Sequence, residues 1–310
     1  MQSRIYEVYP DGQHFLEDAR LFIKQFFFSY SRLNRREFNL TAPGHTAVLR
    51  GRHQAFRKLS RIGLERQGYE TPTIALMSFI LSTFKVDTMY DVGASVGYYA
   101  AMAASLSGKS VTAHAFEMRR DRFHELMETA KQNDVISGKI IPHRAGLSDR
   151  HEGTRDIWFS RTQMFEEKPP VSAYREAWHR RLKFALGGIR DRDQLFQEPV
   201  LLTSIDALVE TTGSPEFIKI DVDGYEGKIL AGATACIAKY RPFILLELHK
   251  DELIGRTGWS RLSIANSLLQ AGYCAAHLSN HDNYRQSRLV DVTAEQSIFE
   301  RQTTMHFLFY

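Results

Sequence analysis

The amino-acid sequence predicts an α/β protein built on a mostly parallel β-sheet, and two observations predict it most directly. From Thr71 onward, short runs of β-branched and aromatic residues alternate with helical stretches, which is typical of βαβ units. Glycines and carboxylates follow two of these runs, at the sheet edge where ligands bind. With 43% hydrophobic and 25% charged residues among 310, the chain has the composition of a globular protein.

Five apolar runs are expected to form parallel strands, and helices are expected to fill the intervals between them. The strands are predicted at residues 88–92, 110–116, 139–144, 217–222 and 243–248. The helices are predicted at residues 98–106, 119–133 and 227–239. Two later runs, at residues 274–278 and 305–309, are expected to add an antiparallel ending to the sheet.

Residues 1–66 differ from the rest of the chain in charge, because they hold 12 Lys and Arg against 6 Asp and Glu. Apolar residues recur at steps of three and four between Phe15 and Phe27, which predicts an amphipathic helix. We interpret residues 1–66 as a basic helical N-terminal extension and residues 67–310 as the main domain. The helix is expected to pack on that domain. The alternatives are a contact with a second copy in a homodimer, with a membrane surface or with a carrier protein.

The interval from residue 149 to residue 199 is far longer than the usual connection between sheet elements. Such an excess favours a lid or a substrate-binding insertion. Tyr174, Trp178, Leu182 and Leu186 follow one another at steps of four, so a basic amphipathic helix is predicted there. Its charged face is either solvated or holds an anionic substrate.

Charge and cysteine content exclude several classes of protein. A formal net charge of +4 is far less than a dedicated nucleic-acid-binding protein concentrates on its surface, so no nucleic-acid partner is expected. The two cysteines, Cys236 and Cys274, lack the spacing of a zinc site or a disulfide framework. The apolar stretches are too short for a signal peptide or a transmembrane segment, which predicts a soluble cytoplasmic protein.

The clearest motif lies where the first strand of the sheet meets the helix that follows it. Gly93 and Gly97 allow a tight turn and a close approach of the backbone to a ligand. A dinucleotide fingerprint would need glycine at Ser95 and Tyr98, so a cofactor with a pyrophosphate is not expected. The residues of this motif predicted to bind the cofactor are Asp91, Gly93, Ala94, Ser95, Gly97 and Tyr98.

A second motif ends the next strand in Glu117, 20 residues beyond Gly97. An acid at this spacing accepts hydrogen bonds from the hydroxyls of a ribose. An adenosine without phosphates, bound by the glycine loop and by this acid, describes S-adenosyl-L-methionine. We therefore predict that cofactor, with Glu117 and the adjoining Met118 among its contacts.

A third motif places carboxylates and glycines directly after a buried strand, from Lys219 to Gly227. With this motif the sequence resembles the FkbM family of class I methyltransferases over residues 68–273. It departs from the family pattern at Ser95, where Asn is usual, at Met118, where Pro is usual, and at Asp223, where Glu is usual. The segments that carry the resemblance are Asp91 to Gly97, Phe116 to Met118, Ser204 to Leu208, Lys219 to Gly224, and Arg241 to His249.

The resemblance implies a Rossmann-like class I methyltransferase fold, mostly parallel with an antiparallel C-terminal strand. It also implies an O-methyltransferase that uses S-adenosyl-L-methionine and modifies a hydroxyl of a sugar, glycolipid or secondary metabolite. Arg144 and Ala145 follow the third strand, where the family places the adenine, and are expected to line that part of the site. The N-terminal extension and the insertion lie outside the resemblance, and they are expected to set the choice of acceptor.

Methyl transfer to an aliphatic hydroxyl benefits from a base beside the acceptor. Three candidates lie at strand ends: Asp221, Glu247 and His249. We prefer His249 as the base, because its unperturbed pKa lies near neutral pH. An alternative is that these three residues and Asp223 hold Mg²⁺ or Mn²⁺, but they lack the spacing of a metal motif and no metal is predicted.

Two other function classes remain open as alternatives. One is a nucleotide-dependent oxidoreductase, which the incomplete glycine fingerprint disfavours. The other is a noncatalytic, partner-binding member of the fold, although the acids of all the motifs are present. The acceptor is expected to be a small molecule or a carbohydrate, with an anionic acceptor as one option.

Overall fold

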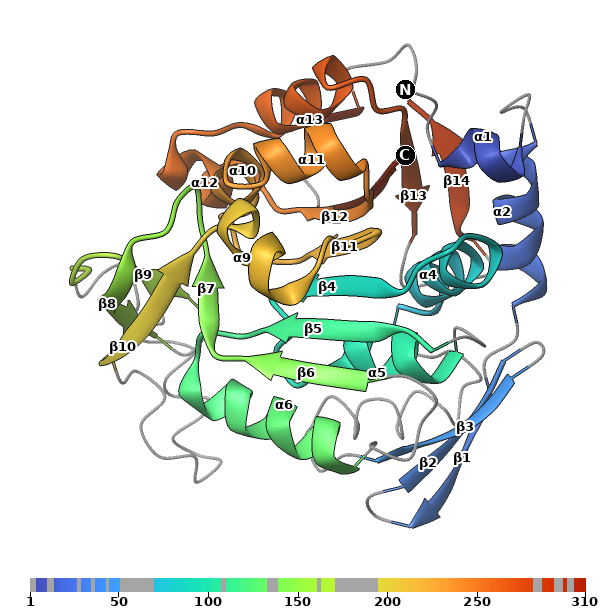
Figure 1. Cartoon of the computed structure of the whole chain (residues 1–310), viewed down its shortest axis with the longest axis horizontal. Helices are drawn as coiled ribbons and strands as arrows, with labels where there is room; N and C mark the ends of the chain where they lie inside the picture. Colours follow the sequence, from blue (N-terminus) through green and yellow to red (C-terminus); the bar gives the residue numbers. More distant parts are fainter. Residues whose placement is uncertain are drawn as a thin grey trace, which may run out of the picture.

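An eight-stranded sheet forms the centre of the computed structural model, in the order β14-β13-β15-β12-β11-β4-β5-β6 (Figure 1). Strands β12, β11, β4, β5 and β6 run parallel to one another, whereas β15 pairs antiparallel with both β12 and β13. The predicted parallel sheet with an antiparallel ending is therefore confirmed. The structure describes residues 4–9, 14–26, 29–34, 37–42, 45–50, 70–106, 110–132, 139–160, 163–170, 195–280, 286–292, 298–299 and 304–310.

The predicted core strands form within a few residues of the expected bounds. They are β4 (Thr88–Val92), β5 (Thr112–Phe116), β6 (Lys139–His143), β11 (Phe217–Ile220), β12 (Phe243–Leu248), β13 (Ala275–Ser279) and β15 (Met305–Phe309). The edge strand β14 (Arg288–Asp291) was not predicted. The principal helices beside them are α4 (Thr71–Thr83), α5 (Tyr98–Leu106), α6 (Arg120–Gln132), α9 (Ile205–Thr212), α10 (Glu226–Ala231), α11 (Thr234–Tyr240), α12 (Asp251–Ile254) and α13 (Arg261–Gln270).

Alternate side chains of the central strands enter two separate cores, because successive residues of a strand point to opposite faces. On β12, Phe243 and Leu245 join the core beneath α4 and α5, while Ile244 and Leu246 join the core beneath α9, α10, α11 and α13. Both faces of the sheet are thus covered. The carboxyl edge of the parallel strands remains as the place for a ligand.

One predicted helix is divided in two. The expected helix at residues 227–239 breaks at Gly232, between α10 and α11. A Cβ at Gly232 would lie 2.1 Å from the Ser148 carbonyl oxygen, so the chain packs there as only glycine allows. This close approach joins α10 to the segment that follows β7 (Ala145–Leu147).

The N-terminal extension is partly as predicted. Helix α2 (Phe15–Gln25) forms, and its apolar face, which includes Phe15 and Ile23, is buried in the same core as α4. The interpretation as a helix packed on the main domain is confirmed, while contacts with a second copy, a membrane or a carrier protein stay predictions. The domain boundary at residue 66 lies outside the described residues.

The expectation that this extension is wholly helical is wrong. A short helix, α1 (Ile5–Val8), precedes α2, and an antiparallel sheet follows it (Figure 1). Its strands are β1 (Ser29–Asn34), β2 (Glu37–Ala42) and β3 (His45–Arg50). The alternation of polar and apolar residues from Glu37 to Ala42 is a strand period, which the charge-based interpretation passed over.

The described part of the predicted insertion forms strands. Strands β8 (Gly153–Phe159), β9 (Met164–Phe165) and β10 (Phe196–Thr203) join β7 in a second sheet of order β7-β10-β8-β9. The predicted amphipathic helix lies outside the described residues. Since β9 and the segment after it approach α10, this sheet extends over the carboxyl edge of the central one.

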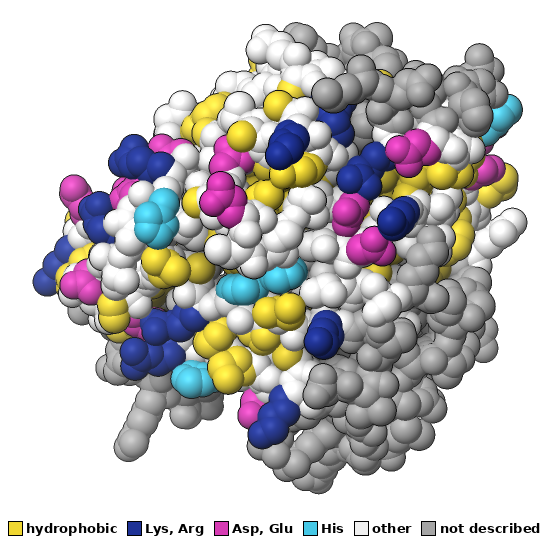
Figure 2. All heavy atoms as spheres, in the orientation of Figure 1, with side chains coloured by type: hydrophobic (Ala, Val, Ile, Leu, Met, Phe, Trp, Pro, Cys, Tyr) yellow, Lys and Arg dark blue, Asp and Glu magenta, His cyan; other side chains and the backbone are white. Residues whose placement is uncertain are grey.

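Basic and acidic side chains are interspersed on the face of the molecule seen in Figure 2. Every helix in the described ranges is too short or too polar to cross a lipid bilayer.

Candidate active site

The turn between β4 and α5 is held by the neighbouring strands. Gly93 and Gly97 have φ angles of +80° and +82°, and Ser95 lies in the same left-handed region at +50°. A Cβ at Gly93 would lie 1.9 Å from the Asp221 carbonyl oxygen, which explains why glycine is needed there. The turn therefore packs directly against the end of β11.

Glu117 secures the same turn from the end of β5. Its Oε2 accepts a hydrogen bond of 3.0 Å from the Ser95 backbone N–H, and its Oε1 accepts one of 2.8 Å from the Arg119 N–H. Burial raises the pKa of Glu117 to about 7, although these two N–H groups oppose the rise. The carboxylate predicted to face a ribose thus also shapes the glycine loop.

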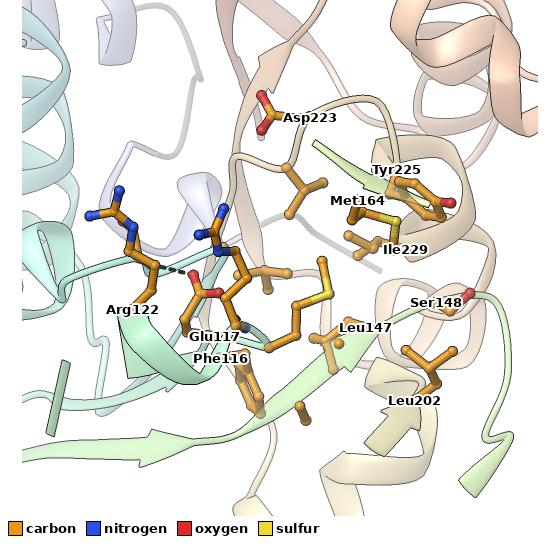
Figure 3. A pocket seen from close by; sticks show the side chains of 18 of the residues that line it. Phe116, Glu117, Arg122, Leu147, Ser148, Met164, Leu202, Asp223, Tyr225 and Ile229 are labelled. Atoms are coloured by element: carbon orange, nitrogen blue, oxygen red, sulfur yellow. Dashed lines mark hydrogen bonds between the residues drawn. The ribbon is translucent and has the colours of Figure 1, made fainter. Parts of the chain in front are cut away.

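A cavity of about 470 Å³ opens at this edge of the sheet, which is within the usual range for a cofactor site. Figure 3 shows Glu117 and Arg122 on one side of it and Met164, Tyr225 and Ile229 across from them. The wall includes the end of β5, the strand β7, the loop after β11 and residues of the second sheet. The predicted site residues that line it are Gly93, Ser95, Glu117, Met118, Ala145 and Asp221.

Other predicted contacts of the cofactor lie away from this cavity. Asp91 is fully buried, and its Oδ2 accepts a hydrogen bond of 3.0 Å from the Ala100 N–H inside α5. Burial raises its pKa to about 6, although Lys219 opposes the rise. Arg144 turns toward the second sheet, where it donates to Glu198 at 3.2 Å. Ala94, Gly97 and Tyr98 also lie outside the lining, so their roles at the cofactor stay predictions.

Asp221 is held by a buried lysine. The Nζ of Lys219 donates to Asp221 Oδ2 at 2.8 Å, lies 4.0 Å from Asp91 Oδ1, and stands 4.2 Å from the ring centre of Tyr99. Burial would raise the pKa of Asp221, but the ammonium group outweighs it and lowers that pKa. Asp221 is therefore an anion at the boundary between the cavity and the buried cluster behind it.

His249 forms a dyad with Glu226, a residue in the first turn of α10 that the sequence analysis did not single out. His249 Nδ1 lies 2.6 Å from Glu226 Oε1, and the Glu226 side chain is completely buried. The opposite nitrogen, Nε2, lies 3.4 Å from Asp223 Oδ1 and 3.7 Å from Glu247 Oε1. A proton on Nδ1 directed at Glu226 leaves Nε2 as the proton-accepting atom.

The carboxylates around His249 decide its charge. Burial by itself would lower the pKa of His249, but the hydrogen bond with Glu226 and the nearby charges of Glu247 and Asp221 raise it to about 9. Burial, reinforced by Asp221 and Glu70, also raises the pKa of Glu247 to about 9. His249 was preferred over a carboxylate because its unperturbed pKa lies near neutral pH. In the folded protein the pKa of His249 is higher than that and is similar to the pKa of Glu247.

The three predicted catalytic residues do come together, since ligand atoms of Asp221, Glu247 and His249 lie within 4.8 Å of one another. Of these, Asp221 lines the cavity, whereas Glu247 and His249 do not. His249 is connected to both cavities through Asp223, which lines them and whose Oδ1 lies 3.4 Å from His249 Nε2. The alternative metal set is thus partly assembled, but Asp221 already has Lys219 as its cationic partner.

A second cavity, of about 620 Å³, adjoins the first and shares Gln163, Met164, Glu166, Asp223 and Tyr225 with it. It runs between the second sheet and the segment from α10 to the 3₁₀ turn Gly255–Thr257. Glu166 closes one side, because it accepts hydrogen bonds from Lys228 Nζ at 2.6 Å and from the Tyr225 hydroxyl at 3.2 Å. Two adjoining cavities suit a site that brings two ligands together.

Several lining residues were not predicted, and they share one origin. They belong to the second sheet or to helix starts whose distance from the sheet edge depends on tertiary packing. Glu226 could have been predicted from its position, because it is a carboxylate in the first turn of the helix that follows a ligand-binding loop. The unpredicted members with polar side chains are Arg119, Arg122, Ser148, Glu152, Gln163, Glu166 and Tyr225.

The central sheet with its antiparallel last strand and the glycine turn after β4 define a Rossmann-like class I methyltransferase fold, as predicted. Residues 91–273, more than half of the chain, match the family profile described as the methyltransferase FkbM domain. The chain belongs to the FkbM methyltransferase family. The predicted cofactor, S-adenosyl-L-methionine, agrees with this membership and is confirmed.

Similar proteins include the hexuronic acid methyltransferase AglP of Haloferax volcanii, which is 27% identical over 165 residues. The match spans 53% of this chain and 56% of that protein, so it covers little more than half of the relative. Methyltransferase FkbM from Methylobacillus flagellatus KT aligns with 83% of this chain and 58% of its own, at 16% identity and a TM-score of 0.45. Aeropyrum pernix fibrillarin, solved with natively bound S-adenosyl-L-methionine, aligns with 91% of this chain and 98% of its own, at 10% identity and a TM-score of 0.41.

Proposed function

We propose that this protein is an S-adenosyl-L-methionine-dependent O-methyltransferase that modifies a hydroxyl of a carbohydrate or of a molecule that carries one. The observation that supports it most is the pair of adjoining cavities, which meet beside Asp223 and Tyr225 at the carboxyl edge of the sheet. Similarity to a hexuronic acid methyltransferase supports a sugar as the acceptor, and an acidic sugar as one option. Cytoplasmic location remains part of the prediction.

The residues that line the first cavity suit the proposed cofactor. Apolar side chains that line the cavity with Ala145, among them Leu147 and Leu202, offer an apolar surface for an adenine, and Glu117 offers carboxylate oxygens to ribose hydroxyls. Asp221 and Asp223 supply negative charge at the opposite end. When bound, the cofactor supplies a methyl group on a positively charged sulfur, and the negative charge of the two aspartates would stabilise that positive charge.

His249 is proposed to accept the proton of the acceptor hydroxyl at Nε2. Glu226 fixes the orientation of the ring and stabilises the imidazolium that forms, as a buried carboxylate does for other catalytic histidines. The positive charge that a bound cofactor would bring to the end of the cavity at Asp221 would lower the pKa of His249. It would thus favour the neutral imidazole, which can accept a proton. Glu247 and Asp221 are proposed to direct the hydroxyl toward this nitrogen.

The second cavity is proposed as the acceptor site. Lys228 and Arg256 stand on its helical side and provide cationic groups for an anionic acceptor, while Glu166 and Glu167 provide acceptors for sugar hydroxyls. Methyl transfer depends on the accurate placement of donor and acceptor, since opposite charges cancel in its transition state and positioning provides much of the acceleration.

Two measurements test the proposal in order. Calorimetric titration with S-adenosylhomocysteine should show one binding site, and the absence of heat and of a thermal shift at millimolar ligand would contradict the cofactor assignment. Incubation with an isotopically labelled methyl donor and fractionated cell extract should then label a carbohydrate, identified by mass spectrometry. Binding without label in any fraction would favour the noncatalytic alternative. Quenching of NADH fluorescence would favour the oxidoreductase.

A further inference from the structure

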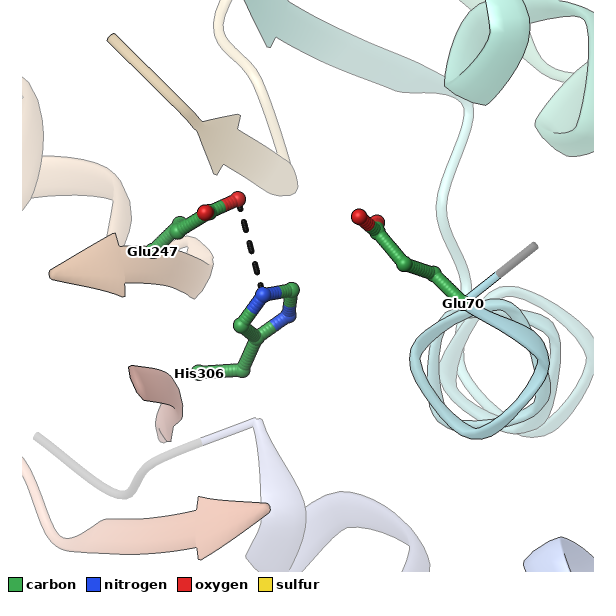
Figure 4. A group of neighbouring side chains, drawn as sticks. All are labelled: Glu70, Glu247 and His306. Carbon is green, nitrogen blue, oxygen red and sulfur yellow. Dashed lines mark ion pairs between the residues drawn. The ribbon is translucent and has the colours of Figure 1, made fainter. Parts of the chain in front are cut away.

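A second group of carboxylates and imidazole lies behind the reaction site. Glu70 precedes α4, Glu247 lies near the end of β12, and His306 lies near the start of β15, and one ligand atom from each lies within 4.8 Å of the other two. Figure 4 shows the three side chains pointing toward one another from three separate elements. Glu70 and His306 are buried, with exposed fractions of 6% and 2%. The function proposed above does not use Glu70 or His306.

Each end of this cluster is oriented by a further side chain. His306 Nδ1 lies 3.1 Å from the Thr73 hydroxyl oxygen, and the Tyr99 hydroxyl donates a hydrogen bond to Glu70 Oε2. With Nδ1–H donated to Thr73, the lone pair of His306 lies on Nε2, which faces Glu247. Partners that fix the outer nitrogen of a histidine and the outer oxygen of a carboxylate are typical of metal ligands.

The spacing inside the cluster is close to that of atoms around an ion. His306 Nε2 lies 3.5 Å from Glu247 Oε2, which is too long for a good hydrogen bond between a nitrogen and a carboxylate oxygen. Ligand atoms at about 2.1 Å from one metal ion lie roughly 3 to 4 Å from each other. The His306–Glu247 distance is within that range, and no pair of the three ligand atoms is more than 4.8 Å apart.

We propose that Glu70, Glu247 and His306 bind one divalent transition-metal ion, such as Mn²⁺ or Zn²⁺. Two carboxylates balance the charge of the ion, and the imidazole favours these metals over Mg²⁺ and Ca²⁺, which prefer oxygen ligands alone. The triad of Asp221, Glu247 and His249 is the less suitable site, because Lys219 Nζ lies 2.8 Å from Asp221. The ion joins the start of α4 to β12 and β15.

The ion also has a consequence for the neighbouring reaction site. Glu247 is shared, since its Oε2 faces His306 and its Oε1 lies 3.7 Å from His249 Nε2. A metal on Oε2 keeps this carboxylate ionised and fixed beside His249. The positioning of Glu247 rests on the function proposed above, whereas the binding of the ion by the three side chains does not.

The test uses the full-length protein, freed of metal with a chelator and dialysed. Calorimetry with Mn²⁺ and with Zn²⁺, and electron paramagnetic resonance of added Mn²⁺, should show one bound ion per chain. Glu70→Gln and His306→Gln should weaken binding by roughly 100-fold or more, and Thr73→Val by about 10-fold, the effect of losing an outer partner. His124→Gln, which changes an exposed histidine on α6, should bind the ions as the wild type does.

Failure of the wild type to bind either ion at millimolar concentration would overturn the proposal, as would a Glu70→Gln variant with wild-type affinity. Circular dichroism establishes that each variant is folded, and Thr73→Val, which preserves shape, keeps the test valid if His306→Gln does not fold. Titration of the same metal-free protein with S-adenosylhomocysteine separates the two proposals. Heat from that ligand without heat from metal removes only the metal site.

Discussion

Glu226 illustrates how a single buried side chain sets the chemistry of a neighbouring one. It has no exposed surface, its Oε1 lies 2.6 Å from His249 Nδ1, and the bond selects which nitrogen of His249 is free. The buried Arg261 also belongs to this environment, because its Nε–H donates to the His249 carbonyl oxygen. Orientation of the histidine therefore depends on α10 and α13 as well as on β12.

Replacement of Glu226 tests this positioning role. Glu226→Gln keeps the size of the side chain but removes the charge that stabilises the imidazolium, so kcat is expected to fall at least about 10-fold with cofactor affinity within a few fold of wild type. Turnover is measured with the labelled methyl donor and binding by calorimetry. Glu252→Gln, at an exposed position of α12, serves as the control. Loss of cofactor affinity with turnover of the bound enzyme intact would assign Glu226 to the cofactor site instead.

Glu117 is expected to contribute to cofactor binding both directly and through the glycine loop. Glu117→Ala removes a carboxylate that bonds two backbone N–H groups, and we expect cofactor binding to weaken by about 1 to 3 kcal/mol. The measurement is the dissociation constant of S-adenosylhomocysteine, with Glu128→Ala on the exposed side of α6 as the control. An unchanged constant would show that Glu117 plays no part in binding.

At the scale of elements, the site depends on how the turn after β4 meets the end of β11. The Gly93 N–H and the Ala94 N–H both donate to the Phe116 carbonyl oxygen, at 3.1 and 3.0 Å. The Asp221 N–H donates to the Val92 carbonyl oxygen at 3.1 Å. Three strand ends are thus joined by backbone bonds, which makes the cavity wall a rigid unit.

Substitution of two glycines that have the same φ distinguishes the cost of a steric clash from the cost of backbone strain. Gly93→Ala introduces a Cβ 1.9 Å from the Asp221 carbonyl oxygen, whereas Gly258→Ala, also at φ +80°, meets nothing within 4 Å. Gly93→Ala should lower the free energy of unfolding by about 3 kcal/mol or more, and Gly258→Ala by about 1 to 2 kcal/mol, the strain alone. Urea unfolding measures both. Equal losses would mean that the turn shifts to accommodate the methyl group.

A histidine pair between β5 and β6 makes stability depend on pH. His114 Nδ1 lies 2.9 Å from His143 Nε2, and burial followed by the charge of His143 lowers the pKa of His114 to about 4. Because the unfolded chain binds this proton near pH 6.5 and the folded protein near pH 4, stability falls as pH falls through that interval. Between pH 6.5 and pH 4, the free energy of unfolding of His114→Gln should therefore fall by about 1 to 3 kcal/mol less than that of the wild type. Parallel curves of unfolding free energy against pH would contradict it.

At the scale of the whole molecule, the first and last parts of the chain close one core together. Phe15 of α2 lies 4.9 Å from Tyr310 and 6.3 Å from Phe243, measured between ring centres. Arg20 Nε–H donates to the Leu289 carbonyl oxygen of β14 at 2.8 Å. The N-terminal helix is therefore part of the main domain's packing, which joins a segment predicted to be an extension to the far edge of the sheet.

Truncation of one buried aromatic side chain measures this contribution. Phe15→Ala should reduce the free energy of unfolding by about 3 to 5 kcal/mol, because the side chain is completely buried among other rings. Leu21 of the same helix is 53% exposed, so Leu21→Ala should change the free energy of unfolding by no more than about 0.5 kcal/mol. Both are read from chemical denaturation. An additional early transition in the Phe15→Ala variant, followed by unfolding of the core as in wild type, would show that α2 folds separately.

The sequence by itself determined the sheet, its cofactor and its family, because these depend on local patterns. Short apolar runs and the helical stretches between them located β4, β12 and α5 to the residue, and the spacing from Gly97 to Glu117 follows from the length of one βα unit. The antiparallel β15 was also predicted, since its apolar run is local as well. The strands β1 to β3 were missed, although their alternation was visible.

Only the tertiary structure decided which polar side chains meet. Glu70, Glu247 and His306 are separated by more than 50 residues from one another along the chain, and no pattern in the sequence relates them. Their approach, like that of Glu226 to His249, follows from the packing of helices on the ends of the strands. The charges of Asp221 and Glu247 then alter the pKa of His249, because Coulomb interactions act through space and strengthen where water is excluded.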